Sequence, residues 1–248
     1  MSNQDRCVAE AASGVFMVAD GVGGRPGGEQ AAEIVVRAVA PRIAAIGMSS
    51  TFAPSDIHTI VGNAIQTARR EMVELAGYVP DYRQMGTTMA MAFVVQDHLC
   101  VSHVGDCRAY LLHDQRLTQL TVDQTFVQVA VDAGMLTADQ ARHHPWRHIV
   151  TNVVGVKPLD QAPDLIVVDL APGDRVLLCT DGLTGVLDHS RLRELLLLSA
   201  DPQTTASRMI EEALDADSRD NITCVVFDLA AAEAQPTKEL LAVNPCAA

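Results

Sequence analysis

The chain lacks the features that would place it in a membrane, on a secretory route or on nucleic acid. No uninterrupted apolar stretch reaches about 18 residues, so the sequence predicts no membrane span. The first residues, MSNQDRC, do not show the basic and then apolar pattern of a signal peptide. The formal net charge is −13, from 31 acidic and 18 basic side chains, and this disfavours nucleic acid or an anionic membrane surface as the main partner.

Paired cysteines are also missing. The chain has six cysteines, and no two of them form a C-x-x-C motif. Four of the six lie in or beside predicted strands, where a free cysteine usually acts as a small buried hydrophobic residue. We therefore expect reduced thiols and a cytoplasmic protein.

The sequence does contain short apolar runs that stop or start at an aspartate. The runs and their aspartates are 14–19 before Asp20, 99–105 before Asp106, 175–180 before Asp181, and 222–229 shortly after Asp220. Each run is short, rich in apolar or β-branched residues and bounded by turn residues, which predicts buried strands. Carboxylates gathered at strand ends would repel one another unless a cation lies among them. The pattern therefore indicates a site for a hard metal ion with oxygen ligands.

The order of the predicted elements favours two antiparallel sheets covered by helices. Helical spacing occurs over 31–46, 55–77, 192–198 and 204–216, and we expect Pro41 to break or kink the first of these helices. Residues 87–95 are apolar on both alternations, as in a strand buried on both faces. Helices and strands do not alternate one for one, so a doubly wound parallel sheet is disfavoured.

The segment Asp20-Gly21-Val22-Gly23-Gly24 has two competing interpretations. Asp-Gly after a strand is a strong turn signal. A glycine-rich nucleotide loop is the alternative, but the G-x-G-x-x-G pattern that starts at Gly21 fails at Pro26, and the chain has no P-loop Gly-Lys-Ser/Thr.

Taken together, the motifs resemble the type 2C (PPM) metal-dependent Ser/Thr protein phosphatases in their bacterial form. The matching segments occur in the family's order over residues 3–229: Asn3-Gln4-Asp5, VADGVGGRPGGEQAA, GTTMAMAFV, VGDCRAYLL, LTVDQT, LLCTDGLTGVL and SRDNITCVVF. The ordered set is much more specific than any one of its motifs.

The resemblance implies a fold, a reaction and partners. The fold would be α+β with four layers (αββα), a central antiparallel β-sandwich flanked by helices, in a catalytic domain over 1–230 with a flexible tail over 231–248. The reaction would be hydrolysis of phosphoserine and phosphothreonine on proteins by a water that bridges two metal ions. An opposing Ser/Thr kinase is the implied partner. The alternative is a catalytically weak or inactive pseudophosphatase that only binds phosphoproteins.

The resemblance also implies roles for individual residues around two Mn²⁺ or Mg²⁺ ions and a weaker third ion. Asp20 would bridge the two ions, and Asp20 and Asp181 would hold the bridging water. The Gly21 carbonyl would bind one ion, Asp181 and Asp220 would bind the other, and Asp106 would bind the third together with Asp181. Asp5 would lie in the outer shell, and Asn221 would support the site.

The chain departs from the family pattern at several positions. The family's phosphate-binding arginine, five residues before Asp5, would fall before Met1, so we expect either a truncated start or another phosphate ligand. Arg25 is a candidate, although a solvated loop arginine is the favoured interpretation. Val22 stands where eukaryotic members carry a histidine that acts as a general acid, and Gln4 replaces a more common glutamate.

A histidine-rich stretch, His143, His144 and His148 around Trp146, looks at first like a zinc cluster. Pro145 argues against one regular helix there, and no cysteine is near. In the family, this stretch follows a variable segment near the active site. We therefore favour a surface loop, then a substrate contact, and a metal site least. For Arg108 and Arg219, beside two of the aspartates, structural ion pairs are the favoured interpretation.

Overall fold

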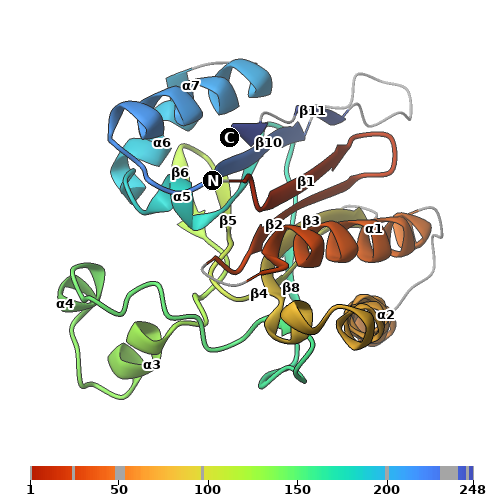
Figure 1. Ribbon diagram of the computed structural model, residues 1–248. Coiled ribbons are helices and arrows are strands. Elements are labelled where there is room, and N and C mark those ends of the chain that lie inside the picture. Colours follow the sequence, from red (N-terminus) through yellow and green to blue (C-terminus); the bar gives the residue numbers. More distant parts are fainter. Residues whose placement is uncertain are drawn as a thin grey trace.

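Two antiparallel β-sheets pack face to face in the middle of the fold, and helices cover both outer faces (Figure 1). The computed structural model describes residues 2–23, 26–47, 54–95, 98–198, 201–229, 240–243 and 246–247. Every strand pairing within these ranges is antiparallel. The predicted αββα architecture of class α+β is confirmed.

The first sheet has the strand order β1-β2-β3-β4-β8, with β7 beside β3. Its strands are β1 (Asp5–Glu10), β2 (Val15–Gly21), β3 (Gly86–Val95), β4 (His98–Val104), β7 (Val154–Gly155) and β8 (Ile166–Asp169). Helices α1 (Gly28–Gly47) and α2 (Pro54–Tyr78) cover its outer face, and the short 3-10 helix η1 (Pro80–Gln84) leads from α2 into β3.

The second sheet has the strand order β11-β10-β9-β5-β6, with β12 beside β10. Its strands are β5 (Arg108–His113), β6 (Arg116–Gln119), β9 (Arg175–Cys179), β10 (Ile222–Leu229), β11 (Leu240–Val243) and β12 (Cys246–Ala247). Its outer face is covered by α5 (Asp181–Thr184), α6 (His189–Leu198) and α7 (Pro202–Asp215).

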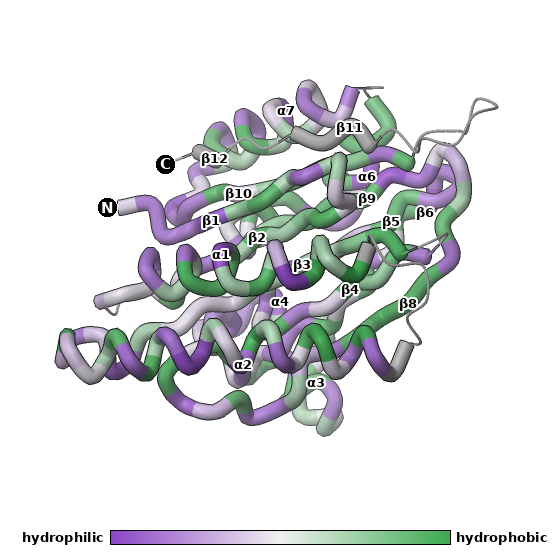
Figure 2. The backbone as a smooth tube through the Cα atoms, turned by 90° about the vertical axis from the view of Figure 1, so that its right-hand side faces the viewer, coloured by the Kyte–Doolittle hydropathy of each residue, from purple (hydrophilic) through white to green (hydrophobic). Residues whose placement is uncertain are grey.

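The central strands are mostly apolar because each of their faces meets a different core. Along β2, Met17 packs towards α1 and α2, whereas Phe16 and Val18 point into the core between the sheets. Phe16 stacks there on Phe227 of β10, with ring centroids 3.7 Å apart. Figure 2 shows the result, with mostly hydrophobic strands in the middle and an α2 that alternates between polar and apolar residues. The strand predicted over 87–95 is confirmed as β3, buried on both faces.

Two details of the sequence interpretation are corrected. Helix α1 does not break at Pro41 but continues through it, because Ile43 and Ile46 beyond the proline stay buried against the first sheet. Arg42 Nη1 also donates a hydrogen bond to Ala38 O at 2.6 Å inside this turn. The other difference is β1, which the sequence analysis did not predict because its residues, DRCVAE, form no apolar run.

The proposed tail over 231–248 lies partly outside the described residues. Its described segments, β11 and β12, pair with β10 at the edge of the second sheet. The domain boundary at residue 230 stays a prediction.

A lobe of the chain projects from the end of the sandwich (Figure 1). We call residues 124–151 the flap. It carries the short helices α3 (Phe126–Asp132) and α4 (Ala138–Arg142) between β6 and β7. Among all the helices that the structure describes, none is long and apolar enough to cross a membrane.

Candidate metal centre

The first two carboxylates of the site face each other across the strand pair β1–β2. In this register Asp5 lies directly opposite Asp20. Asp5 is only 1% exposed, and Thr180 Oγ1 donates a hydrogen bond to its Oδ2 at 3.0 Å. Like charges directly opposite one another on neighbouring strands are destabilising. The pair therefore favours a cation nearby.

The next two carboxylates come from the second sheet. Asp181 begins α5 directly after β9, and Asp220 precedes the neighbouring strand β10. The two segments touch at Gly182, where a Cβ atom would lie 2.0 Å from Asn221 O. Ser218 Oγ also donates a hydrogen bond to Gly182 O at 2.7 Å. Only glycine permits this approach, which holds the two aspartate segments side by side.

Asn221 links these segments to the first sheet. Its Oδ1 accepts a hydrogen bond from Gln4 N at 2.9 Å, and Gln4 O accepts one from Gly21 N at 3.2 Å. The backbone of Gln4 thus connects the start of β10 with the end of β2, whatever side chain position 4 carries.

Asp106 reaches the site from the turn between β4 and β5 and is 8% exposed. Gly105 allows this turn because its φ is +96°, and a Cβ there would lie 2.3 Å from Thr88 Cγ2. Gly105 N donates to Gln124 Oε1 at 2.9 Å, so the turn is also fastened to the base of the flap.

The five carboxylates act on one another electrostatically. Burial raises the pKa of Asp20 well above its usual range, and the charges of the other carboxylates raise it further, in the order Asp5, Asp181, Asp106 and Asp220. A shift of this kind means that the protein itself offers too few positive charges and hydrogen-bond donors to stabilise the ionised form of Asp20.

Asp106 shows the same effect. Burial, followed by the charges of Asp181 and Asp123, raises its pKa to about 8. The pKa of Asp220 is raised by partial burial and by Asp181, whereas the hydrogen bond from Asn221 N and, to a smaller extent, His148 lower it. The sequence-predicted aspartates are therefore brought together from both sheets into one negatively charged centre.

The donor chemistry of this centre fits a divalent cation. Asp181 Oδ1 is buried and has no hydrogen-bond partner among the described residues. As the side chains stand, no group of three or more His, Cys, Asp or Glu within the described ranges is already arranged around an ion position. The carboxylates are thus gathered but do not form a closed ligand shell. Their oxygen atoms are the ligands that Mg²⁺ and Mn²⁺ prefer.

The glycine segment after β2 passes close to the start of α1. A Cβ on Gly21 would lie 2.3 Å from the backbone of Gly28, so no other residue fits there. Val22 N donates to Gly86 O at 2.9 Å, which fixes the segment in front of β3. Arg25, the candidate phosphate ligand, lies outside the described residues.

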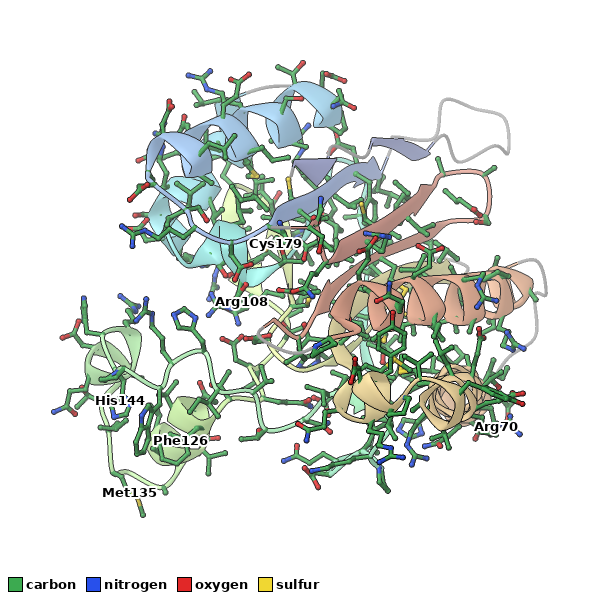
Figure 3. The ribbon with its side chains drawn as sticks, in the orientation of Figure 1. Arg70, Arg108, Phe126, Met135, His144 and Cys179 are labelled. Atoms are coloured by element: carbon green, nitrogen blue, oxygen red, sulfur yellow. The ribbon has the colours of Figure 1, made fainter. Side chains whose placement is uncertain are left out.

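The arginines beside the aspartates form ion pairs, as predicted. Arg108 binds Asp123 through two hydrogen bonds of 2.8 and 2.6 Å. It lies between the sandwich and the flap (Figure 3). Arg219 pairs with Asp217 at 3.4 Å on the surface. Arg108 is therefore occupied by a carboxylate of the protein and is not a free phosphate ligand.

The three histidines of the flap point to different partners. His143 Nδ1 lies 3.0 Å from Asp139 O, and His144 packs in an aromatic group with Phe126 and Trp146 (Figure 3). His148 alone reaches the carboxylates, with its Nδ1 3.7 Å from Asp181 Oδ2. The sequence analysis missed this contact, and no local signal could have revealed it, because the three strands β7, β8 and β9 separate the two residues along the chain.

Comparison with known proteins gives the family. The sequence model described as protein phosphatase 2C matches residues 1–216. The chain belongs to the protein phosphatase 2C family. The resemblance inferred from the ordered motifs is thereby confirmed.

Members of the protein phosphatase 2C family from mycobacteria are similar to this chain over nearly all of its length. This chain is 34% identical over 241 residues to the serine/threonine protein phosphatase PstP of Mycobacterium tuberculosis. The match covers 97% of this chain but only 45% of that protein. A crystal structure of the same M. tuberculosis phosphatase has a TM-score of 0.83, with 33% identity and 93% of each chain covered.

A second structure is described as the catalytic domain of PstP in complex with two manganese ions. It has a TM-score of 0.79 and 31% identity, with 93% of each chain covered. The chain thus corresponds in extent to that domain and spans about 45% of the full M. tuberculosis protein.

Proposed function

We propose that this chain hydrolyses phosphoserine and phosphothreonine monoesters on proteins with the help of divalent metal ions. The observation that carries the proposal is the convergence of five carboxylates from both sheets on one centre, in a chain of the protein phosphatase 2C family. The manganese-bound structure of a 31% identical relative supports Mn²⁺ as the ion. Phosphoproteins and an opposing Ser/Thr kinase would then be the partners.

The carboxylates divide into direct ligands and supporting groups. Asp20 would bridge two Mn²⁺ or Mg²⁺ ions, with the Gly21 carbonyl on one ion and Asp181 and Asp220 on the other. Asp106 would join Asp181 on a weaker third ion. When bound, such ions neutralise the carboxylates, attract the phosphate and lower the pKa of a water that they share.

The protein's own contribution is to hold these ligands in place. Thr180 fixes Asp5 through the hydrogen bond to its Oδ2, so Asp5 can support Asp20 from the opposite strand. Gln4 fixes Asn221 next to Asp220. Because these contacts are made by a backbone amide and a buried hydroxyl group, the supporting residues Asp5 and Asn221 are positioned before any ion or substrate arrives.

The test is hydrolysis of p-nitrophenyl phosphate by the purified chain in Mn²⁺. We expect activity in Mn²⁺, its loss in EDTA, and a fall of at least about 100-fold in kcat/KM for Asp181→Ala, as when one electrostatic support of a transition state is removed. Asp169→Ala is the matched control, because the side chain of Asp169 is exposed and lies opposite His98, at the end of β4 that is farther from Asp106.

The outcomes separate the two function classes. No hydrolysis of p-nitrophenyl phosphate or of any phosphopeptide in Mn²⁺ would refute the enzyme. If the same protein still bound Mn²⁺ and phosphopeptides in calorimetry, the phosphoprotein-binding alternative would take its place.

A further inference from the structure

The flap is anchored at its base and carries basic residues towards the carboxylate centre. Phe126 N donates to Ile149 O, and Thr151 N donates to Gln124 O, both at 2.8 Å, so the two ends of the flap are joined. Gln124 N also donates to Gly105 O at 2.8 Å. The base of the flap is therefore hydrogen-bonded to Gly105, the residue that precedes Asp106.

A cleft of about 1160 Å³ separates the flap from the α5–α6 segment. Asp106 and Asp181 line the sandwich side of this cleft, and Arg142, Arg147 and His148 line the flap side. His148 approaches Asp181 to 3.7 Å, which shows how near the flap comes to the candidate metal ligands. Because Asp106 and Asp181 line this cleft, a residue that neighbours a phosphate held at the carboxylate centre has room to lie in it.

The acidic side chains of the cleft are already engaged. Asp123 is bound by Arg108, and Asp188 accepts hydrogen bonds from Ser190 Oγ and Arg191 N. Asp106 and Asp181 are the proposed ligands of the metal ions, which would neutralise them. With ions bound, Asp188 is the one acidic residue among those lining the cleft whose charge no ion pair or metal ion would neutralise.

The basic side chains of the flap are not engaged in the same way. Arg142 and Arg147 are both exposed, and neither forms an ion pair within 4.0 Å among the residues that the structure describes. Arg142 is within electrostatic reach of Asp188 on the opposite wall. The flap wall is thus positively charged in a protein whose net charge is −13.

The backbone at Arg147 is held by its neighbours. Arg147 N donates to His144 O, and Ile149 N donates to Trp146 O, both at 3.1 Å, which makes a tight turn. Trp146 packs edge-on against Phe126 with ring centroids 5.3 Å apart, so the turn is held against α3. A guanidinium on a held turn loses less freedom on binding than one on a mobile loop.

We propose that Arg147, assisted by Arg142, binds an anionic side chain that neighbours the phosphorylated residue of the substrate. The preferred substrate would be a phosphopeptide with Asp, Glu or a second phosphorylated residue close to the phosphoester. A planar guanidinium binds carboxylate and phosphate oxygens with paired hydrogen bonds, so it suits both. This inference rests on the proposed phosphatase activity and names the substrate class of the same site.

The experiment compares two phosphothreonine peptides that differ only in their flanking residues, glutamate in one and glutamine in the other. In Mn²⁺, the unchanged protein is expected to show a kcat/KM about three- to tenfold higher for the glutamate peptide. Arg142→Gln combined with Arg147→Gln should abolish this preference. Hydrolysis of p-nitrophenyl phosphate should stay the same, because that substrate has no flanking residues.

Arg70→Gln is the matched control. Arg70 is exposed on α2, away from the flap (Figure 3), and should leave the preference intact. Equal kcat/KM values for the two peptides with the unchanged protein would overturn the inference, and so would a preference that survives in the double variant. Absence of p-nitrophenyl phosphate hydrolysis in Mn²⁺ would instead overturn the proposed function, and the inference with it.

Discussion

Asp5 and Asp20 lie directly opposite each other on the antiparallel strands β1 and β2. Asp5 is almost completely buried, and burial contributes most to the raised pKa of Asp20. Two facing carboxylates in this position lower the stability of the protein without a cation and increase it once a cation binds. The carboxylate pair that the proposed function needs therefore lowers the stability of the ion-free protein, and this effect can be measured.

We expect Mn²⁺ to stabilise the chain strongly. An ion present at 100 times its Kd adds about 2.7 kcal/mol, which corresponds to about 5–10 °C in Tm for a domain of this size. Differential scanning fluorimetry with increasing Mn²⁺, against EDTA, measures the shift. A Tm that does not depend on Mn²⁺ would contradict a site made of these carboxylates.

Asp20→Asn should raise the Tm of the ion-free protein while it removes both activity and the Mn²⁺-dependent shift in Tm. Asparagine has nearly the same shape as aspartate, but it does not repel Asp5 or Asp181. Asp169→Asn is the control, and it should keep the shift in Tm and the activity. A variant Asp20→Asn that is less stable than the unchanged protein in EDTA would show that the carboxylate is compensated within the protein.

The sequence predicted most of this centre because the aspartates sit at the ends of apolar strands. The local pattern placed Asp20, Asp106 and Asp181 at the rim of a sheet, and the structure confirms those strands. Asp5 was inferred only from the family resemblance, because β1 contains no apolar run. Its role depends on pairing with β2, which is a contact between strands and leaves no periodic signal in β1 itself.

The contact between His148 and Asp181 shows the other limit of the sequence. Both residues were noticed, but for unrelated reasons. Whether the flap folds back over the carboxylates depends on hydrogen bonds between distant residues, such as those that join Gln124 to Gly105 and to Thr151. Only the tertiary structure reveals such contacts. The same is true of α1, where packing against the sheet outweighs the local effect of Pro41.

Gly182→Ala should disrupt the second half of the centre. The new Cβ would lie 2.0 Å from Asn221 O, so the start of β10 would have to move away from Asp181. We expect a loss of about 1–3 kcal/mol in the free energy of unfolding, together with weaker Mn²⁺ binding in isothermal titration calorimetry.

Gly62→Ala on α2 is the control for a glycine substitution. Nothing lies within 4 Å of a Cβ at Gly62, and alanine favours a helix interior. This variant should gain about 0.5–1 kcal/mol and keep its affinity for Mn²⁺. If Gly182→Ala bound Mn²⁺ as tightly as Gly62→Ala does, the close approach at Gly182 would not be needed for the site.

The pair between His113 and Asp174 should make part of the protein's stability depend on pH. The hydrogen bond of 2.7 Å from His113 Nδ1 to the buried Asp174, and then the charge of Asp174, raise the pKa of His113 above its ordinary value of 6.5. Since the folded state binds this proton more tightly than the unfolded state, the contribution is complete below about pH 6.5 and is lost as the pH rises through the folded-state pKa. Chemical denaturation of the unchanged protein and of His113→Gln at pH 5.5 and pH 8.5 measures it. The difference in free energy of unfolding between the two proteins should be larger at pH 5.5, and a difference that grows towards pH 8.5 would mean that His113 is neutral in this pair.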